Sequence, residues 1–465
     1  MNFTSVTFLF FFLPLVVAAY FAVPRRGWRN GLLLAASLLF YSWGEGFGIA
    51  LLLVSIGMNH VFSQLIARKA QPWLAIGILA NLGLLVAYKY AGLIGDTFVE
   101  LGGGIAQEDA AYRLPLPLGI SFFTFQAMSL LVDVSRGSAP ARSLFRTGLF
   151  ISLFPQLIAG PIVRWDEIRA QIAERRETWE RFADGAKLFV LGLSQKVLIA
   201  DPVSRISDSA FNAEAGTLAT GSAWLGLAAF TIQIFFDFAG YSNMAIGMGR
   251  VFGFDLPANF RHPYSSASFQ EFWRRWHMTL SRWFRDYLYI PLGGSRAGTA
   301  RTYRNLLIVF LLCGLWHGAA WTFLLWGLWH GAFLVAERLA RRSGFPKLPR
   351  VIGVAYTVLF VALGWVLFRA DGLDAALAYW GDLLPGGGGD TVEAPETALY
   401  ALAIGILLSW DGLTRRAEAL GSRGSVGARG TVGAAVRWGG TLVLLLVCFA
   451  AVASSTHQPF LYFRF

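Results

Sequence analysis

Long apolar runs, each bounded by charged residues, recur along this chain. A helix needs about 20 apolar residues to cross a bilayer, at a rise of about 1.5 Å per residue. Runs that reach or approach this length lie near 4–23, 30–44, 47–66, 72–91, 117–134, 184–200, 221–248, 304–318, 320–338, 351–369, 397–411 and 438–455. They predict an all-α, polytopic integral membrane protein with about 11 to 13 transmembrane helices.

The composition supports this class. The chain is 55% hydrophobic and 14% charged, whereas a soluble domain carries about 25% charged residues. We attribute the net charge of +11 to basic residues in cytoplasmic loops and in contact with membrane lipid headgroups, and not to nucleic-acid binding. Cys313 and Cys448 both lie in apolar runs, which predicts buried free thiols, and no spacing suggests a metal site.

Charge in the loops predicts an orientation. The loops at 25–29 and 68–69 are basic and are assigned to the cytoplasm, which places the N-terminus outside. The loops at 95–113 and 371–396 are rich in acidic residues and are expected outside. No basic segment precedes the first apolar run, so we expect it to remain as a span and not to be cleaved.

The run at 148–163 differs from the others because charged residues follow it at once and Pro155 and Pro161 interrupt it. Irregular backbone survives at membrane depth only where protein or a polar cavity surrounds it. This segment therefore predicts a re-entrant element, followed by a charged helix to about 182, beside a central cavity.

Residues 268–288 have the pattern of an amphipathic helix lying in the membrane interface. Aromatic side chains share one face with His277, and arginines occupy the opposite face. On this pattern alone, His277 is either a packed core residue or a reactive group aimed into the protein.

His317 ends an apolar run and is followed by Gly318. An imidazole within the membrane is costly unless it is paired, and histidine is the usual general base near neutral pH. His330 competes for this role because 329–331 repeats the Trp-His-Gly of 316–318. Spacing alone does not choose between the two histidines.

Other polar residues in the spans are candidates for substrate contact. Gln126, Asp237 and Tyr241 lie in apolar runs, and an intramembrane carboxylate should face a cavity or a partner. Asp237 could pair with an arginine, orient a histidine or hold helices together.

Three arginines could hold a phosphate-bearing donor at the cytosolic face: Arg261, Arg274 and Arg275. Contact with lipid headgroups is the competing interpretation. No Ser/His/Asp triad spacing or glycine-rich phosphate loop stands out.

Several motifs resemble one known family. They lie at 117–126, 154–162, 192–196, 236–242, 259–260, 271–294, 315–318 and 460–463. The chain resembles the membrane-bound O-acyltransferases, and within them the bacterial alginate O-acetyltransferase branch. The motifs follow one another along nearly the whole chain, so we expect one membrane-embedded domain over 1–465. Its parts are N-terminal spans 4–134, re-entrant and cytosolic helices 144–182, a catalytic core 221–338 and C-terminal spans 351–455.

The resemblance implies a pair of functional histidines that match His277 and His317, of which His317 is catalytic, whereas His330 lies outside the matched motif. It implies a cytosolic acyl donor, expected to be acetyl-CoA, and no tightly bound cofactor. It also implies an exported polysaccharide and a separate periplasmic acetyltransferase as partners, in the inner membrane of a bacterium.

The predicted function is transfer of an acetyl group across the membrane toward hydroxyls of an exported polysaccharide. His317 would act as general base, and His277 would position or polarise the donor. Two alternatives stay open: a transporter of polysaccharide or lipid-linked sugar, and an O-acyltransferase that uses another donor such as a D-alanyl thioester.

Overall fold

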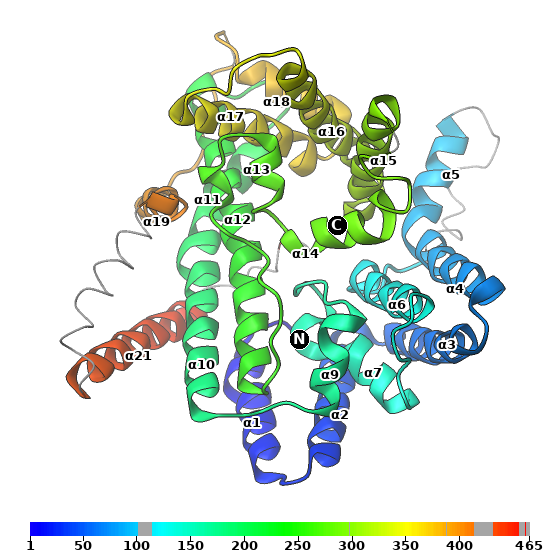
Figure 1. The fold of residues 1–465 in the computed structure, drawn as a ribbon. Helices are drawn as coiled ribbons and strands as arrows, with labels where there is room; N and C mark the ends of the chain where they lie inside the picture. Colours follow the sequence, from blue (N-terminus) through cyan, green and yellow to red (C-terminus); the bar gives the residue numbers. More distant parts are fainter. Residues whose placement is uncertain (101–113, 297, 387, 413–430, 455–460, 462–465) are drawn as a thin grey trace. The chain divides into compact units, whose positions relative to one another are not determined.

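The computed structural model describes residues 1–100, 114–296, 298–386, 388–412, 431–454 and Leu461. Regular secondary structure within these residues is helical, apart from one isolated bridge between Leu218 and Asp390 (Figure 1). This confirms the predicted all-α class. Three segments discussed above lie outside the described residues: residues 101–113 of the acidic loop, the basic loop at 413–430, and the motif at 460–463 apart from Leu461.

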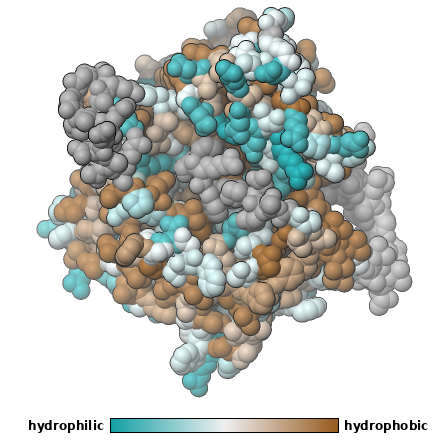
Figure 2. All heavy atoms as spheres, turned by 180° about the vertical axis from the view of Figure 1, so that it is seen from behind, coloured by the Kyte–Doolittle hydropathy of each residue, from teal (hydrophilic) through white to brown (hydrophobic). Residues whose placement is uncertain are grey.

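Among the described residues, four helices are long and apolar enough to cross a membrane: Gly48–Arg68, Gln71–Phe98, Thr220–Val251 and Arg350–Arg369. Shorter apolar helices cover Phe8–Ala22, Ile120–Ser135, Glu396–Leu408 and Trp438–Ser454. Figure 2 shows hydrophobic residues over much of the face that it displays, as contact with lipid requires. The chain is an integral membrane protein; the number of crossings and the outward N-terminus stay predictions.

The described chain divides into two compact units. Unit 1 comprises Met1–Phe189 and Ser242–Pro257, and unit 2 comprises Val190–Tyr241 and the residues from Ala258 onward. The expectation of one domain over the whole chain stays a prediction.

Unit 1 is built from the N-terminal helices. They are α1 (Leu13–Ala22), α2 (Arg26–Glu45), α3 (Gly48–Arg68), α4 (Ala70–Leu85), α5 (Ala91–Glu100), α6 (Ile120–Ser135), α7 (Leu144–Ser152), α8 (Phe154–Leu157) and α9 (Trp165–Ala173). Ion pairs join Glu177 to Arg26 and to Arg29. Glu177 also accepts a hydrogen bond from Tyr20, so one carboxylate ties α1 and α2 to the segment after α9.

The segment predicted to be re-entrant is interrupted, as Pro155 suggested. Leu153 has an extended ψ of 111° between α7 and α8. The Phe154 amide, freed by this break, donates to Ser37 Oγ at 3.0 Å, which satisfies a buried backbone donor. Residues 148–163 are buried throughout. Whether the segment re-enters a membrane stays a prediction.

Most helices of unit 2 follow the predicted runs. They are α11 (Asp201–Phe211), the part of α12 (Thr220–Val251) up to Tyr241, α13 (Phe269–Trp273), α14 (Met278–Phe284), α15 (Thr299–His317), α16 (Trp321–Arg342), α17 (Arg350–Arg369), α18 (Leu373–Asp382), α19 (Glu396–Leu408) and α21 (Thr431–Ser454). Helix α11, and helix α18 within the acidic loop, match none of the predicted runs.

Helix α10 (Trp179–Ser194) packs on α12 through glycines that recur every seven residues. In unit 1, a Cβ on Gly247 would lie 2.6 Å from the Gly185 carbonyl oxygen. In unit 2, a Cβ on Gly240 would lie 2.7 Å from the Gly192 carbonyl oxygen. Small residues at such points let two backbones approach closely, which is the common solution in membrane helices.

The prediction of one continuous helix over 268–288 is wrong. Helix α13 ends at Trp273, His277 has a left-handed backbone with φ 41°, and α14 begins after it. Residues 259–261, which precede α13, form hydrogen bonds with backbone groups that a continuous helix would use. The Arg261 amide donates to the Arg275 carbonyl oxygen and the Met278 amide donates to the Asn259 carbonyl oxygen, each at 2.9 Å. These bonds replace helical ones, and periodicity cannot reveal them.

Candidate active site

Two closely packed helices position His317. It is the last residue of α15, and α16 runs back beside α15. A Cβ on Gly314 would lie 2.2 Å from the Phe323 carbonyl oxygen, and one on Gly327 would lie 2.2 Å from the Phe310 carbonyl oxygen. Since no side chain fits between them, the two glycines hold the helices nearly backbone to backbone.

Aromatic rings enclose the His317 side chain, which belongs to a residue only 4% exposed. The His317 ring centroid lies 5.0 Å from that of Trp326 and 5.2 Å from that of Phe368. A Cβ on Gly318 would lie 2.0 Å from the Phe323 ring. The glycine thus lets this ring pack tightly beside His317, in an environment where electrostatic interactions are strong.

Asn259 holds His277 in one tautomer. His277 Nδ1 lies 3.0 Å from Asn259 Oδ1, which also accepts from the Thr279 amide at 3.3 Å and from Thr279 Oγ1 at 2.9 Å. A backbone N–H only donates, so the amide atom facing it must be the oxygen, and an oxygen here only accepts. Nδ1 of His277 therefore carries the proton.

The other ring nitrogen of His277, Nε2, then carries no proton and has a free lone pair, in surroundings closed to solvent. His277 is fully buried, and its Nε2 has no hydrogen-bond partner among the described residues. Burial lowers the pKa of this imidazole to about 3, so the ring is neutral near pH 7. A neutral ring protonated at Nδ1 offers Nε2 as an acceptor and not as a donor.

The fold brings together the two histidines that the motifs singled out. The ring centroids of His277 and His317 lie 6.4 Å apart, and the Trp316 ring is 5.8 Å from that of His277. His277 comes from the break before α14 and His317 from the end of α15. Their catalytic roles stay predictions.

His330 is occupied by packing. Its Nδ1 faces the indole N–H of Trp273 at 3.3 Å, and its ring lies 4.9 Å from that of Trp326. Because an indole N–H only donates, Nδ1 is an acceptor in use. These contacts are those of a packing residue.

Asp237 lies in a buried ion cluster. Lys196 Nζ is 2.7 Å from Asp237 Oδ1 and 2.6 Å from Asp201 Oδ1, and Asp237 Oδ2 accepts from the Leu461 amide at 2.8 Å. Its partner is thus a lysine, and not one of the predicted partners, an arginine or a histidine. The signal was available, because a buried carboxylate and a buried ammonium both need partners.

The remaining polar candidates, Tyr241 and Gln126, have different surroundings. Tyr241 is buried one turn after Asp237 on α12. Gln126 belongs to unit 1, where its side-chain amide is buried without a hydrogen-bond partner among the described residues. Neither observation assigns substrate contact, so both stay predictions.

The three predicted donor-binding arginines have different surroundings. Arg275 binds Glu271 at 2.7 Å and lies 3.4 Å from Asp411, which compensates its charge. Arg261 is exposed. Arg274 lines the pocket described next, whose lining contains neither Arg261 nor Arg275.

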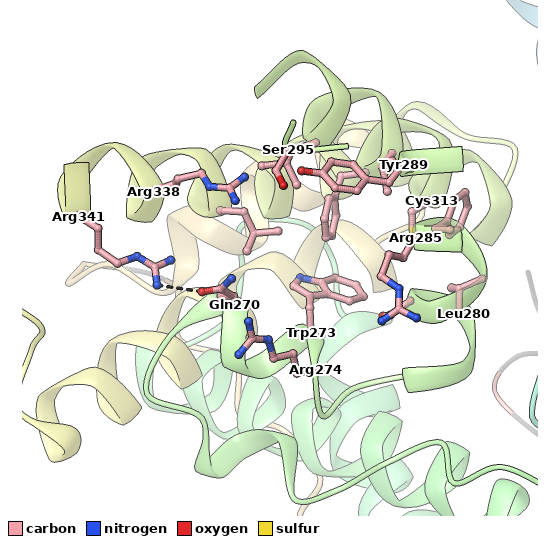
Figure 3. Close-up of a pocket in the computed structure, with 16 residues that line it drawn as sticks. Gln270, Trp273, Arg274, Leu280, Arg285, Tyr289, Ser295, Cys313, Arg338 and Arg341 are labelled. Atoms are coloured by element: carbon pink, nitrogen blue, oxygen red, sulfur yellow. Dashed lines mark hydrogen bonds between the residues drawn. The ribbon is translucent and has the colours of Figure 1, made fainter. Parts of the chain in front are cut away.

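That pocket has a volume of about 400 Å³ and opens among α13, α14, α15 and α16 (Figure 3). Its arginines are Arg274, Arg285, Arg338 and Arg341. The last three were not among the predicted site residues. A recognisable signal was the spacing of Arg338 and Arg341, which puts both on one face of a helix.

Comparison with known proteins agrees with the motifs. The sequence model of the membrane-bound O-acyltransferase family matches residues 122–366. A probable alginate O-acetylase of Azotobacter vinelandii is 40% identical over 416 residues, which cover 88% of this chain and 83% of that protein. A peptidoglycan O-acetyltransferase of Helicobacter pylori is 37% identical over 417 residues, covering 81% and 78%.

A more distant relative is the teichoic acid D-alanyltransferase of Bacillus subtilis, 30% identical over 217 residues, which cover 44% of this chain and 54% of that protein. The family match spans half of the chain, and the alginate and peptidoglycan relatives align with most of it. The chain belongs to the membrane-bound O-acyltransferase family, and it is an O-acyltransferase.

Proposed function

We propose that this protein transfers an acetyl group from acetyl-CoA at the cytosolic face to hydroxyls of an exported polysaccharide. The names of the relatives support this acceptor class, since they include an alginate O-acetylase and a peptidoglycan O-acetyltransferase. The observation that carries the proposal is the meeting of His277 and His317, 6.4 Å apart in a buried aromatic environment.

In this proposal His317 is the general base. It takes the proton from the attacking hydroxyl as the ester C–O bond forms, and it returns that proton to the thiolate released when the C–S bond breaks. A buried base suits this step because bulk water would otherwise compete as an acyl acceptor.

His277 positions the acceptor. Its Nε2 accepts hydrogen bonds in the tautomer that Asn259 selects, so it does not polarise the donor by donating a proton. Sugars carry hydroxyls on neighbouring carbons. One hydroxyl can reach His317 while its neighbour donates to His277, which fits two rings that are close but not bonded to each other.

The decisive experiment complements a deletion strain with wild type, His317→Asn or His330→Asn. The two variants are matched, because each replaces a buried histidine of a Trp-His-Gly sequence. We expect His317→Asn to abolish polymer ester and His330→Asn to retain it, at equal membrane levels. Wild-type ester content in His317→Asn would overturn the proposal.

The same strains address the alternatives. A transporter would lose exported polymer in the inactive variant, whereas an acetyltransferase would lose only the ester groups. The likeness to a teichoic acid D-alanyltransferase makes D-alanyl transfer the second candidate. Mass spectrometry of the ester distinguishes acetyl from D-alanyl. A periplasmic acetyltransferase partner would appear as a further gene needed for the ester.

A further inference from the structure

The pocket beside α13 combines a charged rim with an apolar wall. Figure 3 shows Arg274, Arg285, Arg338 and Arg341 around a cavity that Trp273 also borders. The cavity of about 400 Å³ has no carboxylate in its lining. A concave site of this size falls within the range that binds small ligands.

Two of the four arginines lack a counter-charge. Arg285 binds Asp286 with its Nε 2.7 Å from Oδ1, and Arg341 donates to Gln270 at 2.9 Å and lies 3.9 Å from Glu337. Arg274 and Arg338 form neither an ion pair nor a side-chain hydrogen bond within the described part of the chain. Their guanidinium groups are therefore available to an anion from outside.

The wall of the pocket leads toward the histidines. Helix α15 contributes Leu306, Val309, Phe310 and Cys313, which share one helical face. His317 follows Cys313 by four residues, so it continues this face about 6 Å further along the helix axis. A ligand lying along α15 would thus have its anionic end at the arginines and its other end near His317.

We infer that this pocket binds the phosphate groups of the acyl donor, a nucleotide thioester, through Arg274 and Arg338. Guanidinium groups bind phosphate oxygens in a bidentate fashion, and the indole of Trp273 offers an aromatic surface to a base. The anionic groups lie at one end of such a long molecule, so they would sit at the arginines while its thioester end extends along α15 past Cys313 toward His317. The inference rests on the proposed function.

The test measures binding of CoA to the purified full-length protein in nanodiscs of zwitterionic lipid. Variants are Arg274→Gln, Arg338→Gln and the double variant, and Arg301→Gln is the control. Arg301 is an exposed arginine of α15 outside the pocket lining. We expect each single variant to weaken binding by about 10-fold, the usual size for a hydrogen bond to a charged group. The double variant should weaken it further, and the control should not change it.

Two further arms identify the source of the phosphate. Adding phosphatidylglycerol to the nanodiscs should leave CoA affinity within about 2-fold of its value, since screened surface charge contributes little at physiological salt. Loss of CoA binding on adding that lipid would show a headgroup site and overturn the inference. Unchanged binding in the double variant would overturn it as well, as would a wild type that does not bind CoA.

The outcome is separable from the proposed function. His317→Asn should bind CoA as wild type does while forming no ester. If ester formation depends on His317 but CoA binding ignores Arg274 and Arg338, the enzymatic proposal survives and the pocket assignment fails.

Discussion

Asn259 Oδ1 lies 3.0 Å from His277 Nδ1 and is fixed as an oxygen by the Thr279 amide. One asparagine thereby decides which nitrogen of the buried histidine carries its proton. This contact acts through His277, so Asn259 is a positioning residue.

Asn259→Asp should change the pH dependence of acyl transfer. A carboxylate beside Nδ1 favours the imidazolium, so it raises the pKa of His277 from about 3. Activity that needs the neutral ring is present above that pKa and is lost as pH falls through it. The acid limb of the rate profile should therefore move to higher pH, measured over about pH 4 to 8 where histidine normally titrates. A uniform loss at every pH would indicate a purely structural role.

His277→Asn separates the ring from the backbone. Asparagine tolerates the left-handed conformation that His277 adopts with φ 41°, so this variant should fold and insert. We expect ester formation to fall by about 10²-fold or more, the usual contribution of a positioned acid or base. Ester content in complemented cells measures it, with membrane levels as control. Full activity would remove His277 from the site.

Gly314→Ala should disturb the α15–α16 pair. The new Cβ would lie 2.2 Å from the Phe323 carbonyl oxygen, a backbone atom that cannot move aside. We expect a loss of about 1 to 3 kcal/mol in stability together with loss of activity, because His317 lies one turn further along α15. Thermal unfolding in detergent measures the first.

Gly221→Ala is the matched control for this prediction. Gly221 also lies in a helix, and a Cβ there would meet nothing within 4 Å. Alanine favours helix over glycine by about 1 kcal/mol, so the variant should keep or slightly raise the unfolding temperature. Equal behaviour of the two variants would contradict close packing at Gly314.

Lys196→Met should be severe because it leaves the Asp237 and Asp201 carboxylates without their ammonium. Breaking a buried ion pair from one side costs about 3 to 5 kcal/mol. Adding Asp237→Asn should restore part of the loss, since it removes one stranded charge. The membrane level and unfolding temperature of the two variants measure this coupling. Additive damage would argue against the cluster.

Acid should loosen unit 1 through Glu177. Burial acts to raise the pKa of this carboxyl, but hydrogen bonds from Arg26 and Tyr20 outweigh it and hold the pKa below 4.5. A lowered pKa in the folded protein gives stability that is present above the unfolded value and is lost as pH falls through the folded one. The unfolding temperature should therefore decrease once the pH is lower than about 4.5. Glu177→Gln should have a lower unfolding temperature at neutral pH and should lose less of it on acidification.

Local patterns predicted most helices well. The runs at 304–318 and 320–338 correspond to α15 and α16, because burial and length leave a signal in every residue of such a run. The break at His277 left no local signal. Its cause is pairing with residues 259–261, which compete with the helix through backbone bonds from a distant segment.

The candidate site, like the helices, was predictable only where the signal lies in the local sequence. The histidine pair followed from motifs of a known family, and the structure placed the rings 6.4 Å apart. Arg274 was among the predicted arginines, but the sequence did not show which arginines lack a counter-charge, because that depends on neighbours distant in the chain. Arg275 is compensated by Asp411, more than a hundred residues away, whereas Arg274 next to it is not.

The left-handed backbone at His277 is held in place before any substrate binds. Such a conformation costs about 1 to 2 kcal/mol relative to continuing the helix, and the bonds of Met278 to Asn259 and of Arg261 to Arg275 offset that cost. The backbone around His277 is thus preorganised by main-chain bonds and does not need substrate to adopt this conformation. Slow exchange of the Arg261 and Met278 amide hydrogens in the resting enzyme would be its signature.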